Sequence, residues 1–264
     1  MVAEYQMVER SLREVMSIYS HATREGQTRE MPGVSLVSSG LSLAVFNAAM
    51  LSTPVPGPEG DLARRIAVAR VYFQHLRLPW SLWLCQDMLT PAARQSLEEM
   101  WQKGEFRLTA EPSGMVANSL RPSRRKLPSL DCRLVSDEAT RLAFAQVTSV
   151  VFDLPYATSR QIYGSDQVWS GRFHGFVGYL QGKPVSTVGL WFADDSIGVY
   201  SVGTLPQHQR RGYAEALLRH ALAWGHQQTG ITQTVLQSTR QGLSLYERIG
   251  YRSVTQFAVY VATS

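Results

Sequence analysis

The hydrophobic pattern of the second half of the chain predicts a regular alternation of strands and helices. Residues 130–136 fit a strand, and residues 137–154 carry apolar positions at helical spacing. Residues 173–205 then predict three strands joined by the turns QGKP and ADDS. A helix with an apolar face from Ala214 to Gly225 follows, and then a strand, a short helix and a closing strand over residues 231–238, 241–250 and 251–262. The predicted order is β-α-α-β-β-β-α-β-α-β.

The first half shows a similar but less regular order. It predicts strands over residues 34–40, 41–52 and 79–85, helices over 60–78 and 91–104, and closing strands over 105–120. Between the halves, residues 118–131 break the periodicity with two prolines and four cations, Arg121, Arg124, Arg125 and Lys126. We interpret this segment as a linker and expect two α/β domains, over residues 1–127 and 128–264.

The composition of the chain indicates its cellular location and the kind of ligand it could bind. No apolar run approaches the ~20 residues of a membrane span, and the first residues lack a signal-peptide core, so we expect a cytoplasmic protein without a membrane partner. Cys85 and Cys132 are the only cysteines, which suits a reducing compartment. The net charge of +5 favours an anionic ligand, although such a surplus is also common on a solvated surface.

The junction between the third strand of the 173–205 meander and the next helix predicts an anion site. The first backbone N–H groups of a helix lack intrahelical partners and carry the positive end of its dipole. Gly212 has no Cβ to keep a phosphate from these amides, and Gln209, Arg210 and Arg211 add donors. A pyrophosphate fits this description. A plain helix start with solvated arginines is the alternative.

Two motifs in fixed order give this segment a family resemblance. The sequence QRRGYA places Gln209, Gly212 and Ala214 between a strand and a helix, and a Leu-Tyr-x-x-x-Gly-Tyr segment ends at Tyr251. Residues 130–264 thereby resemble the GCN5-related N-acetyltransferase (GNAT) family. The resemblance implies that family's mixed α+β sheet, acetyl-CoA as cosubstrate without a metal, and cofactor contacts from residues Gln209 to Ala214, which include Arg210, Arg211 and Tyr213. Thr239 stands where many relatives carry a cofactor-binding Asn.

The same resemblance assigns the chemistry. The backbone of Val202, Gly203 and Thr204 is expected to hold the pantetheine arm and the thioester and to stabilise the oxyanion. Tyr246 corresponds to the tyrosine that protonates the departing thiolate. A general base is not identified, because residues 196–204 contain no Glu, His or Asp. Asp194, Asp195 and His174 lie nearby in sequence, and water can also take the proton.

Two function classes remain open. The first is an N-acetyltransferase that transfers the acetyl group directly to an amine of a small molecule or peptide in a ternary complex. The second is a non-catalytic acyl-CoA-binding regulator. Neither a P-loop, a zinc pattern nor a serine-nucleophile elbow is present, and no basic-aromatic stripe supports a nucleic-acid partner. The acceptor pocket is expected around residues 151–164 and the domain interface.

The first half is predicted to be a degenerate copy of the same fold. Where the cofactor loop should lie, residues 52–61 read STPVPGPEGD, with three prolines, two acids and no basic donor. Such a loop should repel a phosphate. An unrelated α/β domain with similar spacing is the alternative, so a tandem GNAT-like arrangement stays an expectation from sequence.

Overall fold

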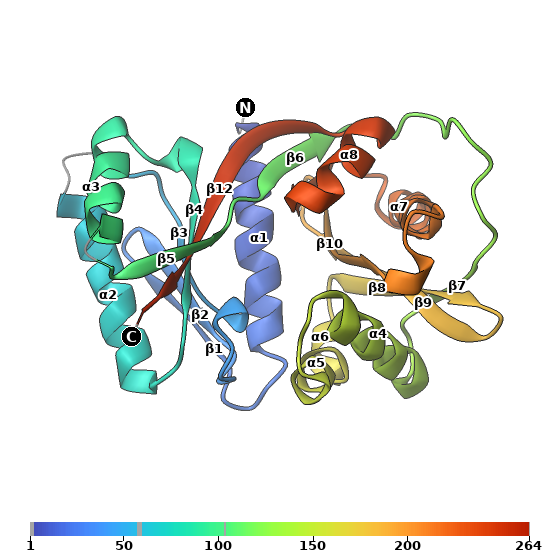
Figure 1. Ribbon diagram of the computed structural model, residues 1–264, viewed down its shortest axis with the longest axis horizontal. Helices are drawn as coiled ribbons and strands as arrows, with labels where there is room; N and C mark the ends of the chain where they lie inside the picture. Colours follow the sequence, from blue (N-terminus) through green and yellow to red (C-terminus); the bar gives the residue numbers. More distant parts are fainter. Residues whose placement is uncertain (1–2, 57–59, 103, 264) are drawn as a thin grey trace. The chain divides into compact units, whose positions relative to one another are not determined.

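The computed structural model describes residues 3–56, 60–102 and 104–263 and divides into two compact units (Figure 1). Unit 1 comprises Met1–Gly114, Ser238–Gln241 and Ser253–Ser264, and unit 2 comprises Met115–Gln237 and Gly242–Arg252. This division differs from the boundary expected between residues 127 and 128. Residues just before the linker belong to unit 2, and the last strand belongs to unit 1, because strand pairing rather than chain order decides membership.

Unit 2 contains the predicted meander and the helices around it. Its strands are β7 (Asp131–Leu134), β8 (Phe173–Leu180), β9 (Lys183–Phe192), β10 (Ile197–Thr204) and β11 (Thr234–Ser238), and its helices are α4 (Glu138–Val151), α5 (Tyr156–Tyr163), α6 (Asp166–Trp169), α7 (Tyr213–Thr229) and most of α8 (Arg240–Ile249). The sheet runs β7-β8-β9-β10-β11, antiparallel except for the parallel pair β10 and β11. Along the chain the predicted order is therefore present, with the short α6 in addition, but the closing strand over Arg252–Ala262 belongs to unit 1 from Ser253 onward.

A segment from before the linker completes the core of unit 2. The strand β6 (Ser113–Ala117) is the other neighbour of β11 in the sheet, and its Met115 and Ala117 are buried in the unit 2 core. The hydroxyl of Thr234 donates to the carbonyl of Ala117 at 3.1 Å. The periodicity of this segment predicted a strand, but it could not show which sheet the strand joins.

Helices cover both faces of the sheet in unit 2, with α7 on one face and α4–α6 on the other (Figure 1). The predicted apolar face of α7 is confirmed, because Leu217, Leu218, Ala221 and Leu222 are buried together with Val188 and Leu190 of β9. On the opposite face α4 packs closely on β10. A Cβ added to Gly203 would lie 2.7 Å from a methyl carbon of Val151, so this position requires glycine.

Unit 1 has its own mixed sheet. Its elements are α1 (Glu4–Ser20), β1 (Gln27–Met31), β2 (Val34–Ser38), β3 (Asn47–Leu51), α2 (Gly60–Leu76), β4 (Ser81–Cys85), α3 (Pro91–Gln102), β5 (Phe106–Ala110) and β12 (Arg252–Ala262). The sheet runs β1-β2-β3-β4-β12, with β5 also paired to β12. The strands β3 and β4 are parallel, as β10 and β11 are in unit 2.

Three features of unit 1 differ from the sequence prediction. The helix α1 and the strand β1 had no predicted counterpart. The strand predicted over residues 41–52 is shorter, because Ala44–Phe46 form a 3-10 turn. The buried Asn47 explains this irregular backbone, since its side-chain amide donates to the carbonyls of Leu41, Leu43 and Pro79.

Candidate functional site

The strand β10 carries a bulge at the segment expected to hold the thioester. Its described parallel pairing with β11 covers Ile197–Val199, and its register with β9 shifts between Tyr200 and Gly203. This shift inserts one extra residue into β10, which is a β-bulge. The predicted residue Val202 lies in the bulge and Gly203 and Thr204 follow it, all three beyond the last described pair with β11. Their backbone therefore lies where the two parallel strands no longer exchange described hydrogen bonds.

The loop after β10 folds back onto that strand. A 3-10 turn at Pro206–His208 follows the strand, and the side-chain amide of Gln209 donates to the carbonyl of Thr204 at 3.1 Å. Arg210 has a left-handed backbone, with φ 58°. Gln209 thus braces the loop, while Arg210 and Arg211 extend from it as exposed side chains.

The helix α7 begins without a side-chain cap. Its N-cap is Gly212, with φ 91°, and no side chain accepts a hydrogen bond from the N–H groups of the first turn. The predicted residues Tyr213 and Ala214 are the first two of the helix. A glycine in this left-handed conformation leaves the amides accessible to an anion. The structure therefore places the predicted glycine at an uncapped helix start with a positive φ, and phosphate binding there stays a prediction.

A third arginine lies at this helix start, from the linker. A Cβ built on Gly212 would lie 3.1 Å from an Nη of Arg125. Within the part of the chain that the structure describes, no ion pair involves Arg125, Arg210 or Arg211. Cations beside the positive end of a helix dipole are unfavourable without an anion between them. In the sequence Arg125 is visible only as one of the four linker cations. Its position beside Gly212 could not be predicted, because the two residues are far apart in the chain.

Tyr246 is a core residue. It lies in α8, its side chain is buried in the unit 2 core, and its ring packs edge-on against Tyr251 with centroids 5.6 Å apart. Burial raises the pKa of the Tyr246 phenol above its ordinary value. The phenol is therefore neutral and protonated at physiological pH. Thr239 belongs to the segment 238–241 of unit 1, and its carbonyl accepts from the Ser238 hydroxyl at 2.9 Å.

The three nearby titratable residues lie at the other end of β10. Asp194 accepts from Arg172 at 2.7 Å, and Asp195 accepts from Ser196 at 3.2 Å, both in the turn before β10. The ring of His174 packs on Phe192, and burial lowers its pKa. At about 3.3 Å per residue, the eight residues of β10 separate this turn from the loop at Gln209 by more than roughly 20 Å. Asp194 and Asp195 therefore lie far from the loop at Gln209, and His174 lies on β8.

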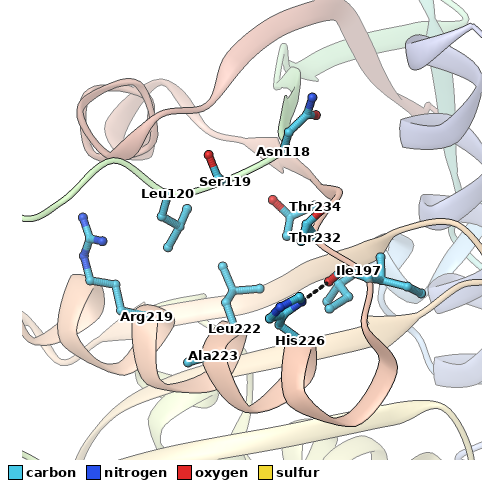
Figure 2. A pocket seen from close by; sticks show the side chains of 11 residues that line it. Asn118, Ser119, Leu120, Ile197, Arg219, Leu222, Ala223, His226, Thr232 and Thr234 are labelled. Carbon is cyan, nitrogen blue, oxygen red and sulfur yellow. Dashed lines mark hydrogen bonds between the residues drawn. The ribbon is translucent and has the colours of Figure 1, made fainter.

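A cavity of about 380 Å³ also lies away from that site (Figure 2). It opens beside the C-terminal half of α7, where β10 and β11 begin. Its walls come from α7, the residues after β6 and the segment before β11: Asn118, Ser119, Leu120, Ile197, Arg219, Leu222, Ala223, His226, Ile231, Thr232 and Thr234. His226 follows the N-cap Gly212 by fourteen positions, which is roughly 20 Å along the helix axis.

The segment expected to line the acceptor pocket does meet β10. Val151, the last residue of α4, touches Gly203, and the phenol of Tyr163 hydrogen-bonds the hydroxyl of Ser201 at 3.0 Å. Val150, Phe152 and Tyr156 are exposed at the connection between α4 and α5. Helices α4 and α5 thus bring the Val151 side chain and the Tyr163 phenol to the bulged segment of β10.

The fold is an α+β domain with an uncapped helix start after a bulged strand, and comparisons with known proteins indicate its class. Residues 171–253 match a family model described as an acetyltransferase (GNAT) domain. This segment contains both QRRGYA and the Leu-Tyr segment. The resemblance seen in the sequence is confirmed, and the chain carries a GNAT domain. No curated protein matches the sequence with significance.

Solved structures extend the fold over the whole chain. A GCN5-related N-acetyltransferase from Kribbella flavida is similar at TM-score 0.74 and 15% identity, over 100% of this chain and 97% of the other. A tandem GNAT protein from the clavulanic acid biosynthesis pathway is similar at TM-score 0.60 and 8% identity, over 99% and 96%. A GCN5-related N-acetyltransferase from Sphaerobacter thermophilus is similar at TM-score 0.58 and 15% identity, over 87% and 76%. The predicted fold class, including the tandem GNAT-like arrangement, is therefore confirmed.

The described residues contain neither a helix that could cross a membrane nor a cluster suited to a metal ion. None of the helices in the described parts of the chain has the length and hydropathy needed to cross a membrane. Within the same residues, no group of three or more His, Cys, Asp or Glu side chains is arranged to hold a metal ion.

Proposed function

We propose that the protein is an N-acetyltransferase that moves the acetyl group of acetyl-CoA directly to an amine. The observation that carries the proposal is the uncapped start of α7 at Gly212, which follows the bulged end of β10. The first supplies amides and positive charge for a diphosphate, and the second supplies strand backbone beyond the described pairing with β11 for a thioester. A GNAT domain over residues 171–253 supports the same conclusion.

The residues have distinct roles in this reaction. Amides of Gly212, Tyr213 and Ala214 bind the diphosphate, and backbone N–H groups of Val202 to Thr204 stabilise the oxyanion. The amine nitrogen forms a bond to the acetyl carbon, the carbon–sulfur bond breaks, and the nitrogen loses one proton to water. Tyr246 supplies a proton to the thiolate and regains one from solvent. The products are an amide and CoA.

The alternative, a non-catalytic acyl-CoA-binding regulator, shares the binding site but not the turnover. Wild-type protein is incubated with acetyl-CoA and a panel of primary amines, and the release of free thiol is followed. We expect thiol release that depends on one amine class. Acetyl-CoA binding without release for any amine would favour the regulator. A cytoplasmic location is part of the proposal, since the cosubstrate is an intracellular metabolite.

We expect one acetyl-CoA per chain, in unit 2. In unit 1 the loop after β3 is tied to the residues after β4, since the N–H of Val55 donates to the carbonyl of Met88 at 2.8 Å. The buried Arg65 of α2 donates to the carbonyls of Gly33, Thr53 and Pro54. Because carbonyl oxygens of this loop already accept from the Arg65 guanidinium, we expect that neither the loop nor Arg65 binds a phosphate. Part of the proline-rich loop, residues 57–59, lies outside the described residues.

The stoichiometry is measured by calorimetric titration of acetyl-CoA into the full chain. One site per chain is the expected result. Two equivalent sites would show that unit 1 also binds the cosubstrate and that the carbonyl cluster around Arg65 does not block it.

Arg125 is expected to strengthen cosubstrate binding. Its guanidinium lies against Gly212, so Arg125→Ala should weaken acetyl-CoA affinity by about 3- to 10-fold, the range of one partly exposed charge-assisted contact. Arg124→Ala is the matched control, because it removes a neighbouring exposed arginine of the same segment. Calorimetry at two salt concentrations checks this. Equal affinities for both variants would show that Arg125 does not touch the ligand.

A further inference from the structure

We propose that the hydroxyls of Ser186 and Thr187 on β9 are positioning groups that direct two backbone amides of β10 towards the acyl end of the cosubstrate. The inference rests on the proposed function and deepens it, because it names the groups that hold the reactive strand in shape. The register between β9 and β10 shifts between Tyr200 and Gly203, so the regular ladder alone does not fix this segment.

Two neighbouring hydroxyls of β9 bind the carbonyls of the bulged segment. The hydroxyl of Ser186 donates to the carbonyl of Gly203 at 2.6 Å, and the hydroxyl of Thr187 donates to the carbonyl of Ser201 at 2.9 Å. Both donors are fully buried. Since the Ser186 proton is used in the bond to Gly203, the hydroxyl of Thr204, 2.9 Å away, donates to Ser186. Side chains of β9 thus hold β10 where the regular register is interrupted.

The bound carbonyls fix the directions of two amides. The peptide bonds of β10 are trans, and a trans peptide directs its C=O and its N–H to opposite sides. The carbonyl of Ser201 shares a peptide with the N–H of Val202, and the carbonyl of Gly203 shares one with the N–H of Thr204. Since β9 binds both carbonyls, both N–H groups point away from the hydroxyls of β9. The other neighbour of β10 in the sheet is β11.

The amides of Val202 and Thr204 lie beyond the described pairing of β10 with β11, whose last pair joins Val199 to Leu236. Amides on one side of an extended strand recur every second residue, roughly 7 Å apart. One can therefore bind the thioester oxygen, which becomes negative as the amine attacks, while the other binds an amide carbonyl of the pantetheine arm. Donors that are already oriented lower the barrier, because they need no reorganisation during the reaction. The two hydroxyls supply this orientation without touching the cosubstrate, so Ser186 and Thr187 act as positioning residues.

The kinetic test compares variants that lose a hydroxyl with one that keeps it. Ser186→Ala and Thr187→Val each remove a donor, and Thr187→Ser retains it. With the amine that the wild type acetylates fastest in a primary-amine panel, we expect the first two to lower kcat about 10- to 100-fold, less than removal of an oxyanion donor itself. The KM for the amine should stay unchanged, because neither hydroxyl is placed at the amine. Thr187→Ser should restore most of the wild-type kcat.

Hydrogen exchange measured by mass spectrometry gives a readout that does not depend on turnover. In the wild type, saturating acetyl-CoA should slow exchange in a peptide that covers residues 201–205, because the cosubstrate accepts from amides of this segment. Calorimetry sets the saturating concentration for each protein. At that concentration the slowing should be smaller in Ser186→Ala and in Thr187→Val than in the wild type.

Ser159→Ala is the matched control. Its fully buried hydroxyl donates to the carbonyl of Ala145 at 2.8 Å and pairs with the hydroxyl of Thr148 at 2.8 Å, the same two kinds of partner as Ser186 has, but within α4 and α5. This variant should keep the wild-type kcat and exchange even where thermal melting shows lower stability. If Ser186→Ala and Thr187→Val behaved like it in both measurements, the hydroxyls of β9 would only pack the sheet, and the proposed function would stand. A wild type that neither binds acetyl-CoA nor acetylates any amine would overturn both.

Discussion

Gly212→Val is expected to reduce the affinity for acetyl-CoA by more than about 100-fold, the largest effect of any single change in the binding site. Gly212 is the N-cap of α7 and has φ 91°, so its Cα closely borders the first amides of the helix. A branched Cβ would occupy the approach to these amides. It would also displace Arg125 or Pro128, each of which lies 3.1 Å from the position of a Cβ.

Backbone strain must be separated from loss of the site, because a β-branched residue at positive φ destabilises any helix end. Gly230 supplies the control. It caps the other end of the same helix with φ 71°, and a Cβ there meets nothing within 4 Å. Gly230→Val should therefore show similar strain in thermal melting but wild-type affinity in calorimetry. Unchanged affinity in Gly212→Val would refute the phosphate cradle.

The sequence predicted the helix start because every feature of it is local. A strand, a turn, a glycine and an amphipathic helix follow one another within residues 197–229, and each is visible as a pattern of apolar and polar positions. The structure adds the reason for Gly212, its positive φ. The bulge of β10 was less visible, because Ser201 and Val202 continue the pattern of the strand without a glycine or proline to mark it.

Contacts between distant parts of the chain were not predictable in the same way. Arg125 was visible only as one cation in a basic run, yet it lies against Gly212. The exchange of strands was equally hidden. Met115 is buried in unit 2 while Phe257 of β12 pairs with Cys85 of β4 in unit 1. Apolar alternation indicates that a segment is a strand, but its partner depends on packing over the whole unit.

Arg65 gives a structural reason to expect that the loop after β3 in unit 1 does not bind a phosphate. The sequence predicted that the loop at residues 52–61 should repel phosphate through its acids. The structure gives a different physical reason, because the carbonyls of Thr53 and Pro54 accept hydrogen bonds from the Arg65 guanidinium. Asp61 pairs with Arg65 at 2.7 Å, so this acid is neutralised within unit 1.

Tyr246→Phe is expected to lower turnover by about 10- to 1,000-fold, the range for loss of a general acid, with little change in acetyl-CoA affinity. Burial raises the pKa of this phenol, which favours the protonated form through neutral and mildly alkaline pH. The Tyr246 phenol is thus protonated and can donate its proton when the thiolate leaves. Deprotonation of Tyr246 should therefore not appear in the pH–rate profile between about pH 6 and 9.

Because Tyr246 is also a core residue, the measurement needs a variant that changes the core equally. Tyr251→Phe is that variant, since its ring packs against Tyr246 and its hydroxyl is also buried. Phenylalanine keeps the ring in both cases, so both variants should melt within a few degrees of the wild type. Thiol release with an accepted amine should fall only in Tyr246→Phe. Equal turnover in the two variants would mean that the proton reaches the thiolate from water or from another residue, and that Tyr246 serves only to pack the core.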